Sequence, residues 1–216
     1  VATQTIIASD KKVLDISFDD YEEKIHQPSE GLLKMSNGGV LTWTGILFRK
    51  EVIDKVGLLD EKVGGPADLD FELRTSSAFS YTVIKSLGAI FYHNELSWSS
   101  NWSVVEPLEG LKIILEKIKN NKDIPLSVRE IAYQSFKKNT TRIIWRGGIN
   151  DITKRRYNEA KVTSESLKND FNENLKASIV YNTAKLCEFS DAFYYLLIGL
   201  NWIRKSVNPK RRMKEK

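Results

Sequence analysis

The sequence has little cysteine and lacks the loops that most often hold nucleotide phosphates. Its single cysteine, Cys187, excludes an intrachain disulfide framework and fits a reducing compartment. Neither a G-x-G-x-x-G nor a G-x-x-x-x-G-K-[ST] pattern is present, so no phosphate-binding loop of those types is expected. The apolar run at 193–203 is shorter than the roughly 20 residues that cross a bilayer. No signal peptide is recognisable in these residues, and a native start upstream of Val1 would hide one.

Positive charge is concentrated at the C-terminal end of the chain. The net charge is +5. Residues 203–216 contain seven basic residues and one acidic residue, a net charge of +6, so residues 1–202 carry a net charge of −1. A nucleic-acid-binding domain spreads its basic residues, with aromatics among them, over a folded face. No specific nucleic-acid partner is therefore predicted, because such binding would depend on the tail alone.

The composition is that of an ordinary globular protein, with 41% hydrophobic and 28% charged residues. In the first part of the chain, residues 50–56 fit a short helix, and residues 68–77 fit a helix that opens on Asp68 as an N-cap or first-turn residue. Residues 19–38 are polar and indicate a loop with one helical turn. Apolar and β-branched runs predict strands at 1–8, 13–18, 40–48, 80–85 and 88–92.

The pattern becomes helical after Trp102. Apolar residues recur at helical spacing between 108 and 118, and Pro125 is a good first residue for a further helix. The glycine pair 147–148 is expected to end that helix. A highly charged helix is predicted at 151–175 and an apolar one at 177–204.

Residues 39–93 carry the most informative pattern in the chain. A small-residue turn and an apolar segment are followed by a short helix, a Gly-Pro loop, a helix that opens on acidic residues, and an apolar strand that ends on Tyr-His. This order resembles the acceptor-side half of the family-2 glycosyltransferases, which are inverting enzymes of the GT-A fold. The residues that fall on the family pattern are, in order, Gly45, Arg49, Gly57, Asp60, Glu61, Asp68, Asp70, Arg74, Tyr92 and His93.

The resemblance implies an α/β fold in two parts. Residues 1–104 would be the C-terminal, acceptor-side part of a GT-A (Rossmann-like) domain with a mixed sheet, and residues 105–216 an all-helical region with a basic tail. The family's donor-binding half ends in a strand that delivers a metal-binding D-x-D. Here the only D-x-D, at 68–70, follows Gly-Gly-Pro-Ala. We therefore expect the donor-binding half to be missing, the chain, which starts at Val1, to be the later part of a longer protein, and the fragment to be inactive alone.

Asp68 is the predicted catalytic residue. In the family, the acid at this position is the base that takes the proton from the acceptor hydroxyl as that hydroxyl attacks the anomeric carbon. A carboxylate at the start of a helix is favoured by the unpaired backbone N–H groups there. The alternative is that Asp68 only caps the helix. Ala67 stands where the family often has Glu, which departs from the pattern without affecting the base.

Two further charged residues and one histidine are candidates by the same resemblance. Asp70 is predicted to bind a sugar hydroxyl, with a solvent-facing side chain as the alternative. Arg74 is expected to be a structural ion-pair partner. His93 ends an apolar strand, where side chains often face a ligand crevice, and is predicted as a ligand of the divalent cation, Mn²⁺ or Mg²⁺, of the complete enzyme. A histidine hydrogen-bonded within its loop is the alternative.

Aromatic residues suggest a place for the acceptor. Trp98 and Trp102 lie four residues apart among small polar residues, so Trp98 is predicted to be a sugar platform, since an indole face packs on the C–H surface of a sugar. The alternative is that these indoles fasten the loop to the helical part. Trp43 and Gly45 occupy the turn that faces the acceptor in the family and are predicted to bind substrate.

A looser resemblance narrows the subfamily. Several bacterial rhamnosyl- and galactofuranosyltransferases carry Y-Y-x-x-R-N near residue 133. Tyr133, Lys138 and Asn139 are similar to this pattern, with Lys in place of Arg.

The predicted function is transfer of a sugar from a nucleotide-sugar donor to a saccharide or lipid-linked acceptor in bacterial surface polysaccharide synthesis. The predicted location is the cytoplasm, with peripheral attachment to the inner face of the cell membrane as a further expectation. The aromatic, apolar run at 193–203 precedes the basic tail and could lie on an anionic membrane surface. A core helix is the alternative for that run. The rival function is a non-catalytic helical interaction or membrane-docking module.

Overall fold

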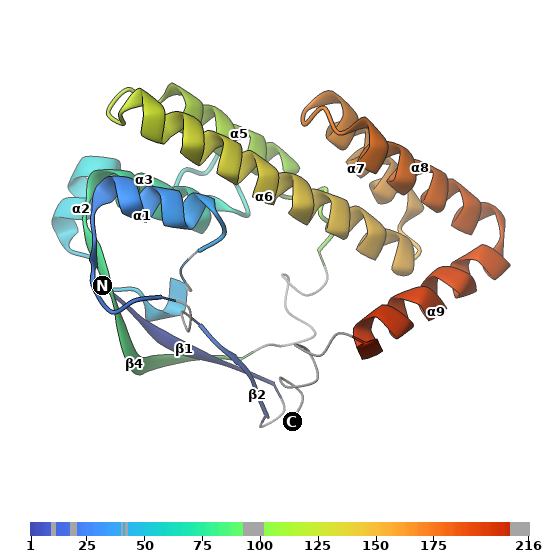
Figure 1. Cartoon of the computed structure of the whole chain (residues 1–216), viewed down its shortest axis with the longest axis horizontal. Coiled ribbons are helices and arrows are strands. Elements are labelled where there is room, and N and C mark those ends of the chain that lie inside the picture. Colours follow the sequence, from blue (N-terminus) through green and yellow to red (C-terminus); the bar gives the residue numbers. More distant parts are fainter. Residues whose placement is uncertain (10–11, 18–20, 40, 42, 93–101, 208–216) are drawn as a thin grey trace. The chain divides into compact units, whose positions relative to one another are not determined.

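A computed structural model describes residues 1–9, 12–17, 21–39, 41, 43–92 and 102–207 (Figure 1). By its internal contacts the chain forms two compact units that interleave in sequence. Unit 1 comprises residues 1–100 and 109–139, and unit 2 comprises residues 101–108 and 140–216. The predicted division at residue 104 separates a catalytic from a helical part, and it stays a prediction.

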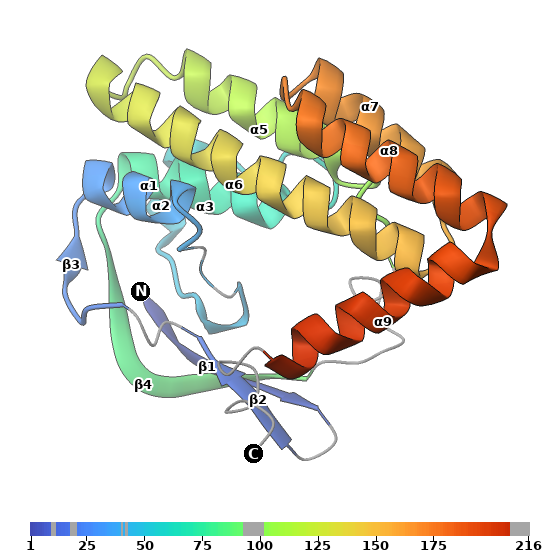
Figure 2. The ribbon, with the colours of Figure 1, turned by 45° about the vertical axis from the view of Figure 1, so that its right-hand side comes forward.

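Unit 1 contains a small mixed β-sheet. Strands β1 (Ala2–Ser9) and β4 (Tyr81–Tyr92) are parallel, and β2 (Lys12–Ile16) is antiparallel to β1 on its other side. The two-residue strand β3 (Ile25–His26) pairs antiparallel with the first residues of β4 and completes the order β2-β1-β4-β3. Figure 2 shows that β4 bends strongly along its length. The α/β fold class with a mixed sheet is thus confirmed.

Among the described residues, five α-helices contribute to unit 1. Helices α1 (Pro28–Ser36) and α3 (Ala67–Ala78) lie side by side (Figures 1 and 2), and α2 (Lys50–Val56) precedes α3. Helix α5 (Leu108–Asn120) and the first half of α6 (Leu126–Thr153) follow later in the chain. The buried core of unit 1 includes Leu32, Phe71, Leu73, Val83 and Ile114.

Unit 2 is helical. The second half of α6 is followed by α7 (Tyr157–Asn169), α8 (Asn174–Phe189) and α9 (Asp191–Val207). Helices α7 and α8 pack against each other. Among the described residues no helix is both long enough and apolar enough to cross a membrane.

Several predicted elements match the structure and others do not. The helix at 50–56 is confirmed, and the helix at 68–77 is confirmed to within one residue at each end. The prediction of a loop at 19–38 was wrong, because Pro28 starts a nine-residue helix that buries Leu32 and Met35. The predicted strands 80–85 and 88–92 are one continuous strand, β4.

The predicted strand at 40–48 is also wrong. Its described residues contain the short 3₁₀ helix η1 (Trp43–Gly45) and a single bridge between Ala2 and Ile46. Residues of η1 approach β1 closely, since a Cβ on Gly45 would lie 2.8 Å from the carbonyl oxygen of Thr3.

The glycine pair 147–148 does not end a helix, because α6 continues to Thr153. A Cβ on Gly148 would lie 2.9 Å from the Thr163 side chain and 3.1 Å from that of Val180, and one on Gly147 would overlap Val104. These glycines therefore permit close packing within unit 2. The charged helix predicted at 151–175 is shorter in the structure, where it corresponds to α7. The apolar helix predicted at 177–204 is two helices, α8 and α9, which are separated at Ser190.

Candidate functional site

The start of α3 and the loop before it form the centre of the candidate site. The loop from Gly57 to Pro66 connects α2 to α3, and it contains two glycines with positive φ, Gly57 at 81° and Gly64 at 66°. Pro66 precedes the first helical residue, and the first turn of α3 carries Asp68 and Asp70. The structure thus places both predicted acids at a helix N-terminus, where negative charge is favoured.

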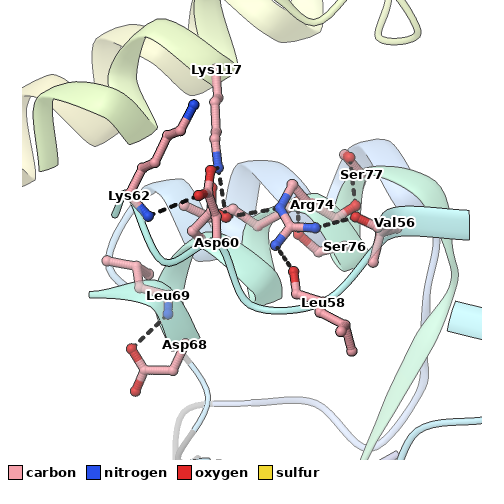
Figure 3. Close-up of polar contacts among 12 residues, drawn as sticks. Val56, Leu58, Asp60, Lys62, Asp68, Leu69, Arg74, Ser76, Ser77 and Lys117 are labelled. Atoms are coloured by element: carbon pink, nitrogen blue, oxygen red, sulfur yellow. Dashed lines mark hydrogen bonds and ion pairs between the residues drawn. The ribbon is translucent and has the colours of Figure 1, made fainter. Parts of the chain in front are cut away.

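Asp70 is buried in an ion-pair network. It is 1% exposed, and its Oδ2 accepts hydrogen bonds from Arg74 Nε and Lys117 Nζ, both at 2.9 Å. Lys117, on α5, also pairs at 2.8 Å with Asp60 in the loop before α3 (Figure 3). The ammonium group of Lys117 is the main reason that the pKa of the Asp60 carboxyl is lowered. Two acids and two cations thereby fix the loop, α3 and α5 to one another.

Arg74 extends this network to the loop backbone. Its guanidinium donates to the carbonyl oxygens of Val56 and Leu58, the latter at 2.9 Å (Figure 3). These two carbonyls flank Gly57, whose φ of 81° and ψ of −179° suit glycine alone among the residues. The predicted ion-pair partner role of Arg74 matches this geometry. Gly57, Asp60, Asp70 and Arg74, which are separate in the sequence pattern, therefore act together to hold the loop.

Asp68 lies outside the network. Its side chain is exposed, and its Oδ1 accepts a hydrogen bond from the backbone N–H of Leu69 at 2.7 Å. Figure 3 shows the Asp68 carboxylate pointing away from Arg74 and Lys117. The helix-start geometry therefore presents one of the two predicted acids to solvent and buries the other.

A cavity of about 660 Å³ lies within unit 1 beside α3. Its wall is mostly apolar and includes an aromatic cluster in which the Trp43 ring is 5.6 Å from that of Phe71, and Phe48 is 5.3 Å from Phe71. Trp43 remains 38% exposed. Gly45, the other acceptor-side prediction, is buried against β1 and does not line the cavity. The structure thus brings Trp43, but not Gly45, to the cavity wall.

Glu72 is the acidic side chain that the structure buries in this wall. It is 4% exposed, and its Oε2 accepts a hydrogen bond from the backbone N–H of Leu41 at 3.0 Å. Burial, and then the charge of Asp68, raises the pKa of Glu72 to about 8, although the Leu41 N–H opposes that shift. The carboxyl is therefore largely protonated at neutral pH, where it can donate a hydrogen bond.

The metal prediction has no counterpart among the described residues. They contain no group of three His, Cys, Asp or Glu side chains that could hold a metal ion. His93 and Trp98 lie outside the described residues, so the predictions for them stay predictions. Asp70 does not suit a cation either, because Arg74 and Lys117 already neutralise it.

Sequence reasoning missed Glu72 and Lys117. Glu72 lies four residues after Asp68, so its position one turn along the same helix could have been inferred from helical spacing. Its contact with Leu41 could not, because 31 residues separate the two in the sequence. Lys117 gave no sequence signal, since it is one of several lysines on an amphipathic helix.

Comparison with known proteins adds no assignment. No family model, no curated protein and no solved structure matches the chain.

Proposed function

We propose that the chain is the acceptor-side part of an inverting glycosyltransferase of the GT-A fold. It would transfer a sugar from a nucleotide-sugar donor to a saccharide or lipid-linked acceptor of a bacterial surface polysaccharide. The observation that carries the proposal is the arrangement at the start of α3. Residues of the sequence pattern that lie apart in the chain hold one loop, and that loop leads into an exposed carboxylate, Asp68.

The proposed mechanism uses Asp68 as a general base. The acceptor hydroxyl loses its proton to the Asp68 carboxylate while its oxygen forms a bond to the anomeric carbon. The bond from that carbon to the nucleoside diphosphate breaks in the same step, and the diphosphate leaves with the electron pair. The anomeric configuration is inverted, because attack and departure occur on opposite faces. Asp70 and Arg74 position the helix start. The described residues offer no ligand set that fits Mn²⁺ or Mg²⁺.

The test is Asp68→Asn in the full-length protein. Loss of a positioned base removes about 10²- to 10⁴-fold in rate, while donor binding should be unchanged. Asp54→Asn is the matched control, because Asp54 is an exposed acid on the neighbouring helix α2. Release of nucleoside diphosphate in the presence of acceptor measures the rate. Near-normal turnover of Asp68→Asn would refute the assignment.

The missing donor half is tested separately. Calorimetry of residues 1–216 with UDP- and dTDP-sugars plus Mn²⁺ should detect weak binding or none. Tight, metal-dependent binding would mean that the donor site lies within this chain, with the motif at 68–70 as its metal-binding element.

A second role, docking to a membrane surface, is favoured by α9. Its side chains Phe193, Leu196 and Leu200 recur at helical spacing and are 47%, 58% and 56% exposed. An apolar face of this kind is typical of helices that lie in the membrane interface. In the sequence the basic residues of 204–216 follow directly, and each Lys or Arg near an anionic leaflet contributes about 1 kcal/mol. We propose an anionic membrane surface as a partner of unit 2, whether or not the protein is an enzyme.

Vesicle co-sedimentation tests this role. Deletion of 204–216, or higher salt, should release the protein from phosphatidylserine vesicles, because salt screens charges beyond about 8–10 Å. Leu196→Glu should weaken binding further. Leu175→Glu is the control, since Leu175 is 74% exposed at the start of α8 but lies outside the apolar face of α9. If the intact chain does not co-sediment with such vesicles at low salt, the membrane-docking role is excluded.

A further inference from the structure

Two polar side-chain atoms in the cavity beside α3 have no hydrogen-bond partner among the residues that the structure describes. Glu72 Oε2 accepts from Leu41, but Glu72 Oε1 has no hydrogen bond within the described part of the chain. The Oγ1 atom of Thr75 is buried and likewise has no partner among the described residues. Glu72 and Thr75 lie three residues apart on α3, so they share one helix face, and both line the cavity. Buried polar atoms are normally hydrogen-bonded, which points to a ligand here.

The rest of the wall is suited to an apolar ligand. Trp43, Phe48 and Phe71 form its aromatic part, and Met35 and Val52 contribute aliphatic surface. A volume of about 660 Å³ is within the range of small-molecule sites, which combine apolar walls with a few placed polar groups. A free saccharide fits this wall poorly, because most of its hydroxyls would lose water without gaining a partner.

Charges near Glu72 favour an uncharged ligand. The charge of Asp68, on the same helix α3, disfavours a negative charge at Glu72. The phenols of Tyr21 and Tyr81 are neutral at physiological pH, since burial raises the pKa of each. Arg49 and Glu51 also line the cavity and pair with each other at 3.2 Å. The α-ammonium group of Val1 lines it as well and donates a hydrogen bond to the carbonyl oxygen of Leu47 at 2.7 Å.

We propose that this cavity binds the hydrocarbon part of an uncharged amphiphile, with Glu72 and Thr75 hydrogen-bonding an oxygen where its apolar body meets its hydroxyl-bearing head. The carboxyl of Glu72, when protonated, donates to that oxygen, and Thr75 can donate or accept. Asp68 is one helical turn from Glu72, towards the helix start. The inference therefore rests on the proposed function in one respect, that the head is the sugar acceptor. It narrows the acceptor class to amphiphilic glycosides.

The experiment is binding of n-octyl β-D-glucopyranoside, below its micelle concentration, to residues 1–216, measured by calorimetry and by methyl chemical shifts. Methyl β-D-glucopyranoside has the same head without the tail. The octyl compound should bind at least about tenfold more tightly at pH 6.5, because each buried CH₂ contributes favourably. Its binding should place shift changes at Met35 and Val52. Equal affinities, or shift changes confined to α9, would overturn the proposal.

Variants of Glu72 test the polar contact. Affinity of the unaltered chain for octyl glucoside should fall several-fold between pH 6.5 and pH 9.5, as Glu72 ionises, and Glu72→Gln should remove this dependence while retaining binding. Glu165→Gln, at an exposed position on α7, should behave like the unaltered chain. The same pH dependence in Glu72→Gln would assign it to another group and overturn the role of Glu72.

Two further variants separate this inference from the other proposals. Asp68→Asn should bind octyl glucoside at pH 6.5 as the unaltered chain does, because the base does not contact the tail. If the unaltered full-length protein binds octyl glucoside but transfers no sugar, the proposed function is refuted and the cavity ligand stands. Leu196→Glu should also leave binding unchanged, since it alters α9 only; loss of binding there would place the detergent on α9 and overturn the proposal.

Discussion

The two compact units differ in how they keep acidic side chains away from water. In unit 2, Asp151 is 1% exposed and lies beside a cation: Arg156 forms an ion pair with its Oδ1 at 2.6 Å, and Ser103 donates a hydrogen bond to its Oδ2 at 2.8 Å. In unit 1, two cations pair with Asp70 in the same way, but Glu72, two residues later, is buried with no paired cation among the described residues. A buried ion pair is a structural device, whereas a buried carboxyl without a cation beside a cavity is a candidate for ligand binding.

The largest expected effect is on the ion-pair network of unit 1. Arg74→Met removes one cation from Asp70 and both donors to the loop carbonyls, so the free energy of unfolding should fall by about 3 kcal/mol. Urea denaturation measures this, and hydrogen exchange should show faster exchange at 57–78. Arg49→Met is the control, because its pair with Glu51 is 86% and 59% exposed and should contribute less than about 0.5 kcal/mol. If Arg74→Met lowers the free energy of unfolding only slightly, the ion pairs of Asp70 do not stabilise unit 1. Asp70 and Glu72 would then no longer differ in this respect.

The next largest effect concerns Glu72 and depends on pH. Its pKa is about 8 in the folded chain against an ordinary value of 4.5. Between these pH values the unfolded chain releases a proton that the folded chain retains, so stability falls as pH rises and levels off above pH 8. Glu72→Gln cannot ionise. It should therefore be more stable than the unaltered chain by roughly 2–3 kcal/mol at pH 9, and nearly equal to it at pH 4.

Thermal unfolding at the two pH values measures the difference. Glu165→Gln in unit 2 is the matched control and should show no pH-dependent gain, because Glu165 is exposed. If Glu72→Gln gives the same small change at both pH values, folding does not raise the pKa of Glu72. Glu72 would then not differ in protonation from the ion-paired acids Asp70 and Asp151.

The contrast between the units also explains what could be predicted from the sequence. Helices α2 and α3 were predicted nearly to their ends, since Gly57 after α2 and Pro66 before α3 are local signals. The contact of Asp70 with Lys117 spans 47 residues, and no local pattern encodes it. Gly147 was read as a helix end for the same reason, because Val104, which it contacts, lies far away in the sequence. Asp68 could be singled out only through the family resemblance.

A smaller loss of stability is expected for Gly57→Ala in unit 1. The φ of 81° at Gly57 is strained for any residue with a Cβ, and the turn presents the carbonyls of Val56 and Leu58 to Arg74. The free energy of unfolding should fall by about 1–2 kcal/mol. In the Arg74→Met variant, Gly57→Ala should lower the free energy of unfolding by less, because the two carbonyls have already lost their hydrogen bonds to Arg74. Full additivity of the two changes would show that the turn and the network are independent.

The smallest expected effect has the opposite sign and lies in unit 2. Gly199 is exposed in the interior of α9, and a Cβ there would meet nothing within 4 Å. Gly199→Ala should therefore raise the free energy of unfolding by about 0.5–1 kcal/mol, because alanine has less backbone freedom to lose and a higher helix propensity. Thermal unfolding followed by circular dichroism measures the gain, and Gly57→Ala is the matched control of opposite sign. Destabilisation by Gly199→Ala would mean that another surface packs closely on α9 in solution. The exposed apolar face of that helix would then be an internal contact, and its proposed place on a membrane would fail with it.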